Sequence, residues 1–336
     1  MKAVVCERPM ELGVRIIPAP VRAPGEVLLR MRRVGLCGTD YHIFAGNQPY
    51  LSYPRVMGHE LAAEVVEADE ESALIPGQVV TLNPYLACGN CVACRKDKPN
   101  CCTSIQVLGV HRDGGMCEFL VAPESAVIPV GSLDLDQAAM VEFLSVGAHA
   151  VRRGETAPGD RVLVVGAGPI GVAVALFARA AGADITLIDT SAPRLAYARD
   201  AIGIDRTVIV DDGLQERLSA LTEGDFFDVV FDATGNAKAM ERGFDFVAHG
   251  GSYVLVSIVK QTISFADPEF HKREMRLIGS RNATHDDFRT VIAAIERGEV
   301  PTDAIKTHVF PLEESPRRLP ELIASQDSVL KAIAIV

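Results

Sequence analysis

The chain lacks any apolar stretch long enough to cross a membrane as a helix. The apolar, uncharged run at residues 162–178 is shorter than the ~20 residues that a membrane span requires. Three glycines and a proline interrupt this run, so we interpret it as a strand, a turn and a helix. Residues 1–20 contain no apolar signal core and no small-residue cleavage site. We therefore expect a cytoplasmic protein.

Basic blocks are also absent. The chain has 33 Lys and Arg against 44 Asp and Glu, a formal net charge of −11. This acidic balance argues against nucleic acid and against membranes as partners, and favours an ordinary solvated surface. No tandem repeat or low-complexity linker divides the 336 residues, a length that predicts about two domains.

The pattern of predicted secondary structure changes along the chain. The first part is rich in Val, Pro and Gly, with short strand-like runs at 26–36 and 76–82, and it predicts an irregular β-rich domain. Strand-like runs then alternate with helix-like segments, which predicts a parallel sheet covered by helices. The expected strands are 161–167, 184–190, 205–210, 227–235 and 252–258, and the expected helices are 169–182, 191–203 and 239–251. An amphipathic helix at 284–300 and a closing strand at 329–336 follow.

Five of the eight cysteines lie within residues 88–102. In a cytoplasmic protein such clustering indicates a metal site rather than disulfides. The Cys-x2-Cys-x2-Cys-x7-Cys spacing supplies four thiolates for a tetrahedral, coordinatively closed structural zinc. The predicted ligands are Cys88, Cys91, Cys94 and Cys102. Cys101 competes with Cys102 for the fourth position, and spacing alone excludes neither.

Several motifs together resemble the medium-chain zinc-dependent alcohol dehydrogenases over nearly the whole chain. The cysteine lobe, at about residues 86–104, is similar to that family's structural-zinc lobe, whose fourth cysteine lies eight residues after the third; this resemblance selects Cys102. "GLCGTDYH" and "YPRVMGHE" resemble the family's zinc segments, and "GAGPIG" resembles its dinucleotide loop. "MVEFLSVGAHAVRR" resembles the sorbitol and polyol branch. "KPNCCTSIQVLGVHRDGG" and "SRNATHDDF" are similar to bacterial dehydrogenases of sugar acids such as galactonate and gulonate.

The resemblance implies an α/β fold with two domains. A GroES-like, β-rich catalytic domain would span residues 1–148 and contain the structural-zinc lobe. A Rossmann domain with a doubly wound parallel sheet would span residues 149–280 and bind NAD. A return segment, 281–336, would complete the catalytic domain.

A second, catalytic zinc site is implied by the same resemblance. Cys37 and His59 are the expected ligands, and Glu60 and Glu142 complete the set either directly or through water. Taken alone, each of these residues is more simply interpreted as an ordinary core or surface residue. A carboxylate at Glu142, where liver-type enzymes have a cysteine, is typical of the polyol branch.

Three residues that follow Cys37 have implied roles in proton handling. Asp40 would hold the second ring nitrogen of His59, although a turn-forming Asp is the alternative. Thr39 would contact the reacting hydroxyl, and His42 would end a proton relay, although a surface histidine is its alternative. Three nearby aromatic residues either line the substrate pocket or belong to the hydrophobic core: Tyr41, Phe44 and Tyr50.

The nucleotide site can be derived from the residues themselves. The glycines of the GxGxxG motif follow an expected strand and open an expected helix, the context in which they bind a pyrophosphate. Asp189 lies at the end of the next strand. Its carboxylate can accept hydrogen bonds from the ribose hydroxyls and repels a 2′-phosphate, so we expect NAD rather than NADP as the cofactor. By resemblance Arg194 contacts the ribose, with a surface arginine as its alternative. The predicted contacts are Gly166, Gly168, Pro169, Ile170, Gly171, Asp189, Arg194 and Thr234.

The implied reaction is hydride transfer from a secondary hydroxyl of a polyol or sugar acid to NAD, with two zinc ions per subunit in a dimeric or tetrameric homo-oligomer. L-Threonine dehydrogenase is one alternative, a zinc-free reductase of the same fold is another, and a regulatory NAD-binding protein without turnover is a third. The ligand set at Cys37, His59 and Glu60 argues against the zinc-free enzyme.

Overall fold

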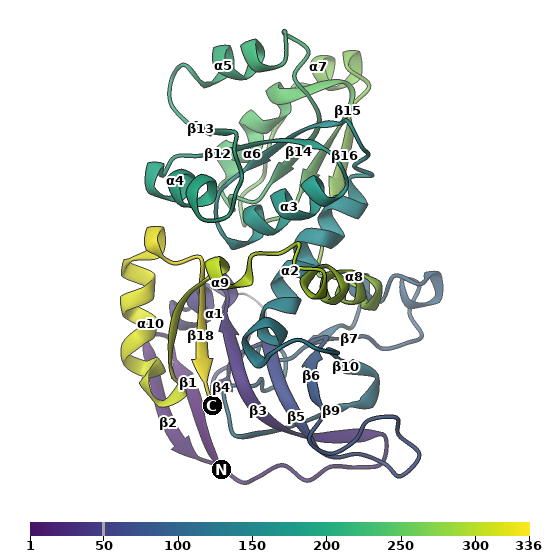
Figure 1. Cartoon of the computed structure of the whole chain (residues 1–336), viewed down its shortest axis with the longest axis vertical. Helices are drawn as coiled ribbons and strands as arrows, with labels where there is room; N and C mark the ends of the chain where they lie inside the picture. The colour runs from purple at the N-terminus through teal and green to yellow at the C-terminus, as the bar shows by residue number, and fades with distance from the viewer. Residues whose placement is uncertain (49–50) are drawn as a thin grey trace. The chain divides into compact units, whose positions relative to one another are not determined.

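The computed structural model describes residues 1–48 and 51–336 (Figure 1). The chain divides into two compact units. Unit 1 joins Met1–Phe143 with Ala283–Val336, and unit 2 comprises Leu144–Asn282. The C-terminal segment therefore belongs to the same unit as the N-terminal segment.

Unit 1 is built mainly from β-sheet. A seven-stranded sheet has the order β10-β6-β5-β3-β18-β17, with β9 paired to β3. Smaller sheets have the orders β2-β1-β4 and β7-β8. The strands are β1 Lys2–Arg8, β2 Glu11–Ile16, β3 Glu26–Leu36, β4 Arg55–Val56, β5 Glu60–Glu67, β6 Val79–Leu82, β7 Tyr85–Leu86, β8 Gln106–Val107, β9 Phe119–Pro123, β10 Val127–Pro129, β17 Lys306–Pro311 and β18 Lys331–Ile335.

Unit 1 also contains helices. Burial follows the hydrophobic pattern: in α8 one face, which includes Phe288, Val291 and Ile295, is buried. Asp287 of α8 accepts hydrogen bonds from the backbone N–H and hydroxyl of Thr284, a capping box that fixes where the helix begins. The helices are α1 Gly38–Phe44, α2 Leu135–Arg153 (which continues into unit 2), α8 His285–Glu296, α9 Thr302–Ile305 and α10 Ser315–Ala324.

Unit 2 contains a six-stranded parallel sheet with the order β13-β12-β11-β14-β15-β16. Its central strands are almost wholly buried apolar runs, as expected where helices cover both faces. Figure 1 shows this sheet among helices α3 to α7. The elements are β11 Arg161–Val165, α3 Pro169–Ala180, β12 Asp184–Asp189, α4 Ala192–Asp200, β13 Thr207–Ile209, α5 Leu214–Leu221, β14 Phe227–Asp232, α6 Ala237–Gly243, β15 Val247–Leu255, α7 Asp267–Lys272 and β16 Arg276–Gly279.

The predicted fold class is confirmed: a β-rich domain accompanies a doubly wound parallel sheet. One expected helix is wrong in part. The segment 239–251 continues α6 only to Gly243, passes through a 3₁₀ turn and enters β15 at Val247. Val247 pairs with Phe227 of β14, so sheet pairing overrides the local helical pattern.

Within the described ranges 1–48 and 51–336, no helix has the length and apolar character needed to span a membrane.

Candidate active site

Strand pairing in unit 1 brings the two predicted zinc segments together. Cys37 immediately follows β3, and Glu60 opens β5, which is antiparallel to β3 with Gly35 opposite Glu60. The candidate ligand atoms of Cys37, His59 and Glu60 all lie within 4.8 Å of one another. His59 and Glu60 are buried, at 5% and 0% exposure. Residues more than twenty positions apart thus form one compact group.

The Glu60 carboxylate has a partner that the sequence analysis missed. Lys331 opens β18, and its neighbour Ala332 pairs with Leu36 of β3. Its Nζ lies 2.7 and 2.6 Å from the two carboxylate oxygens of Glu60 and 3.2 Å from the carbonyl oxygen of Leu36. Lys331 is only 1% exposed, and its Nζ lies 4.1 Å from the centre of the Phe143 ring. The pair is therefore a buried ion pair.

Glu142 lies outside the three-residue ligand group. It is carried by α2 and is 3% exposed, and its carboxylate accepts a hydrogen bond from the hydroxyl of Tyr85. Burial, assisted by Glu60 and opposed by His59, raises the pKa of Glu142 to about 7. Glu142 is thus close enough to the group to share its electrostatics.

Asp40 is fully buried on α1, but its contacts differ from those expected. Its carboxylate accepts the backbone N–H groups of Cys37 at 2.9 Å and Gly58 at 3.3 Å. The Asp40 Oδ1 atom lies 4.0 Å from His59 Nδ1, beyond hydrogen-bond distance, so the predicted hydrogen bond is not formed. Asp40 therefore fixes the loop on which the ligands lie and acts on His59 through its charge.

The other residues of this segment are more exposed. Thr39 is half-buried and His42 is exposed, both on α1. Tyr41 and Phe44 pack in or against the hydrophobic core of unit 1. The predicted pocket residue Tyr50 lies outside the described residues.

The donor set fits a divalent cation. Three buried carboxyl groups, those of Asp40, Glu60 and Glu142, lie near a thiol and an imidazole, and Lys331 contacts the carboxylate of Glu60. Burial alone would lower the pKa of His59, but the charges of Asp40, Cys37 and Glu142 outweigh it and raise that pKa. In the described part of the chain, His59 Nδ1 is buried with no hydrogen-bond partner. Sulfur, nitrogen and oxygen donors in one group are typical of zinc, so Cys37, His59 and Glu60 fit a zinc ion.

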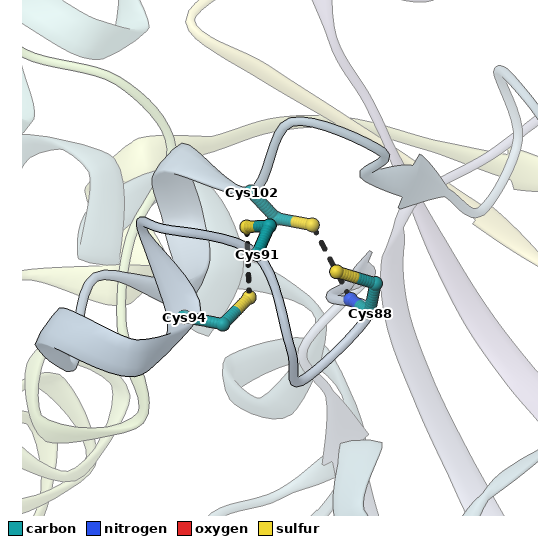
Figure 2. A group of neighbouring side chains, drawn as sticks. All are labelled: Cys88, Cys91, Cys94 and Cys102. Carbon is teal, nitrogen blue, oxygen red and sulfur yellow. Dashed lines mark hydrogen bonds between the residues drawn. The ribbon is translucent and has the colours of Figure 1, made fainter.

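The second cysteine group forms a separate site in unit 1. Sulfur atoms of Cys88, Cys91, Cys94 and Cys102 lie within 4.8 Å of one another, and Figure 2 shows them converging from a looped backbone. Backbone N–H groups of Cys94 and Thr103 lower the pKa of Cys91 to about 5, which favours the thiolate that zinc requires. Cys102 is 2% exposed, whereas Cys101 is exposed and outside the group. The arrangement fits a structural zinc.

The glycine loop lies between β11 and α3 in unit 2. Gly166 has φ +105°, a conformation that L side chains rarely adopt. A Cβ on Gly171 would lie 1.7 Å from the carbonyl oxygen of Gly166, so only glycine permits this close approach. Gly168 caps α3, which begins with Pro169 and Ile170, and the loop therefore presents a helix N-terminus.

A cavity of about 420 Å³ adjoins this loop. Its lining includes Gly166, Gly168, Asp189, Arg194 and Thr234, which are five of the predicted nucleotide contacts. Gly171, Pro169 and Ile170 are not among its lining residues and belong to the loop and helix that support it. Parallel strands β11, β12 and β14 end beside one another, which gathers these residues at one sheet edge.

Comparison with known proteins shows the family of the chain. Residues 23–132 match the model of the alcohol dehydrogenase GroES-like domain, and residues 169–297 match that of the zinc-binding dehydrogenases. The chain is 41% identical over 312 residues to L-galactonate-5-dehydrogenase of Escherichia coli K12, covering 93% of this chain and 92% of that protein. The chain belongs to the zinc-binding alcohol dehydrogenase family. The predictions of a dehydrogenase and of its fold are confirmed.

Two further matches extend the comparison of this dehydrogenase. It is 31% identical over 306 residues to D-altritol 5-dehydrogenase of Agrobacterium fabrum, covering 89% of each chain. A crystal structure of an alcohol dehydrogenase from E. coli CFT073, complexed with NADH, superposes with a TM-score of 0.93 at 26% identity. That superposition covers 100% of this chain and 99% of the other.

Sequence reasoning missed several residues of this dehydrogenase. Lys331 interrupts the apolar run "VLKAIAIV", and a charge inside a buried strand was a signal that could have identified it. Tyr85 had no such signal, because its partner Glu142 is 57 residues away in the sequence. Lys238 and Arg242 also line the nucleotide cavity. Arg242 lies in the segment 239–251 that was interpreted as a helix, and Lys238 immediately precedes it.

We expect Lys331→Met to destabilise the zinc-free dehydrogenase by about 3–5 kcal/mol, because without Lys331 and without a metal ion Glu60 is an unpaired buried charge. The double variant Lys331→Met/Glu60→Gln should recover much of this loss, since no unpaired charge remains. Urea unfolding of both proteins and of Lys331→Arg, the charge-preserving control, measures the effect. Equal losses in the single and double variants would contradict an energetic role for the pair.

The buried carboxyl group of Asp232 should make the folding stability of the dehydrogenase depend on pH. It is fully buried at the end of β14, and its Oδ1 atom accepts the backbone N–H and hydroxyl of Thr234. Within the described residues its Oδ2 atom has no partner. Burial raises the pKa of Asp232 to about 6. Because the folded state then holds a proton that the unfolded state has lost, stability falls as the pH rises from about 4 to about 6.

The Asp232→Asn variant should keep the accepted hydrogen bonds without the charge. We expect it to exceed the parent in unfolding free energy by about 1–3 kcal/mol at pH 7. The difference should vanish near pH 4, where the parent carboxyl is protonated. Asp225→Asn, at an exposed acid paired with Arg161, should change stability by less than about 1 kcal/mol. Chemical denaturation at several pH values tests this, and a pH-independent difference would contradict it.

Proposed function

We propose that the dehydrogenase oxidises a secondary hydroxyl of a polyol or sugar acid to a ketone, with transfer of hydride to NAD. The observation that carries this proposal is the 41% identity to L-galactonate-5-dehydrogenase over 93% of the chain. The D-altritol relative supports the same substrate class. L-Threonine 3-dehydrogenase has less support as an alternative.

In this proposal Cys37, His59 and Glu60 hold the catalytic zinc, and Glu142 acts beside them through Tyr85 or water. Zinc in such a site is a Lewis acid that lowers the pKa of a hydroxyl group that it binds. Thr39 orients the substrate hydroxyl, and the exposed His42 passes its proton to solvent. Asp40 holds the ligand loop through the N–H groups of Cys37 and Gly58.

The proposed nucleotide contacts are the glycine loop, Asp189, Arg194 and Thr234. Asp189 favours NAD because its carboxylate suits ribose hydroxyls better than a phosphate. The NADH complex of the structural relative supports this choice. A structural zinc in the Cys88–Cys102 lobe would bring the total to two zinc ions per subunit. The protein would act in the cytoplasm as a dimer or tetramer, with domain limits at residues 148 and 280.

A substrate screen tests the proposal. The zinc-loaded enzyme is offered L-galactonate, D-altritol, sorbitol, L-threonine and ethanol with NAD, and NADH absorbance is followed. We expect a sugar acid or polyol to give the highest kcat/KM. Faster oxidation of ethanol would contradict the substrate class, and faster oxidation of threonine would favour the alternative enzyme.

A further inference from the structure

The nucleotide cavity of unit 2 carries an excess of positive charge. Three cationic side chains line it: Arg194 from α4 and Lys238 and Arg242 from α6. Among the described residues of the lining, Asp189 is the one acid. NAD needs no cation around its adenosine ribose, because that sugar is uncharged. The pyrophosphate of NAD can be accommodated by the glycine loop and the N-terminus of α3, so the two α6 cations exceed what NAD requires.

The charge of Asp189 is partly satisfied by the protein itself. Its Oδ2 atom accepts the backbone N–H of Ala167 at 2.7 Å, and its Oδ1 atom accepts that of Ser191 at 2.7 Å. Each carboxylate oxygen retains a lone pair for a ribose hydroxyl. These hydrogen bonds spread the negative charge onto the loop backbone and weaken, without removing, its repulsion of a phosphate.

Lys238 and Arg242 differ in their ion pairing from three other arginines of unit 2. Arg199, Arg206 and Arg217 pair with carboxylates at 2.7–2.8 Å. No carboxylate in the described structure pairs with Lys238 or Arg242 within 4.0 Å.

The guanidinium of Arg242 is only half-buried, and its carbon lies 5.8 Å from the ring centre of the buried Phe246. The hydrogen bond from Arg217 and, to a smaller extent, the charge of Arg242 lower the pKa of Asp211, but the Asp211 carboxylate is paired with Arg217 at 2.7 Å. A planar cation that is supported by an aromatic ring and has no ion-paired carboxylate of its own can bind an anion.

We propose that Lys238 and Arg242 receive the 2′-phosphate of NADP, so that the dehydrogenase accepts NADP as a second cofactor beside NAD. The inference rests on the proposed function, because it places the adenosine end of the cofactor in this cavity. Asp189 then sets the preference for NAD, and the α6 cations limit how strong that preference becomes.

The test measures dissociation constants of NADH and NADPH by fluorescence on the holoenzyme. The parent should bind NADPH more weakly than NADH, but by less than about a hundredfold. Lys238→Met/Arg242→Met should increase the NADPH-to-NADH ratio of dissociation constants by about tenfold or more, because two charge-assisted contacts are lost. Arg199→Met, which removes an arginine of α4 outside the cavity lining, should leave the ratio unchanged.

A second variant isolates the phosphate. Asp189→Ala should reverse the cofactor preference in favour of NADPH, because Lys238 and Arg242 already line the cavity. Adding Lys238→Met/Arg242→Met to this variant should abolish the reversal. Binding of 2′,5′-ADP, which has the phosphate but no nicotinamide, should follow the same order. An NADPH-to-NADH ratio that the α6 substitutions leave unchanged would overturn this inference alone. Failure of the parent to bind NADH would overturn the proposed function together with it.

Discussion

The His59→Ala variant is expected to lose alcohol oxidation by at least ~10³-fold while it still binds NADH. His59 is buried within 4.8 Å of the donor atoms of Cys37 and Glu60, so its removal leaves a thiol and a carboxylate already paired with Lys331. Such a pair of donors is too few for a catalytic zinc. The glycine loop lies in unit 2 and is unaffected by this change.

Zinc content, NADH fluorescence and turnover are measured on the same preparation. The variant should lose one zinc per subunit and keep its dissociation constant for NADH. His249→Ala, at an exposed histidine of β15, is the matched control and should retain both zinc and activity. Full activity of His59→Ala would rule out the proposed metal mechanism, and joint loss of NADH binding would indicate unfolding instead.

The Cys102→Ser variant should lose the other zinc ion and much of the stability of unit 1. The Cys102 sulfur is buried and accepts backbone N–H groups of Cys88 at 3.3 Å and Ser104 at 3.4 Å. Structural zinc contributes roughly 10–16 kcal/mol to the folding of isolated zinc-finger peptides, so even a fraction of this would lower the melting temperature strongly. Metal analysis and thermal unfolding measure the two effects.

Cys101→Ser provides the neighbouring control, because Cys101 is exposed and lies outside the four-sulfur group. It should keep both zinc ions and melt within a few degrees of the parent. The reverse pattern, with zinc lost from Cys101→Ser and retained by Cys102→Ser, would show that the other register of the cysteine pattern is used.

Much of the fold was predictable because its determinants are local. The buried runs of β11, β12 and β14, each followed by a helix, indicate a parallel sheet before any contact is known. The glycine loop is equally local, since Gly166 and Gly171 are five residues apart and their close approach depends on the turn between them. Sequence could likewise place Cys88, Cys91 and Cys94, whose short spacing lets one loop present three sulfurs.

Only the tertiary structure decided how the charges of the catalytic group are paired. Lys331 meets Glu60 because β18 and β5 both pair with β3, a relation between strands more than 260 residues apart. The Asp40–His59 separation of 4.0 Å depends on the competing N–H groups of Cys37 and Gly58. The entry of segment 239–251 into β15 likewise follows from pairing with β14. Local sequence determines turns, capping and periodicity, whereas the partner of a buried charge depends on which strands become neighbours, and that is settled only when the whole core packs.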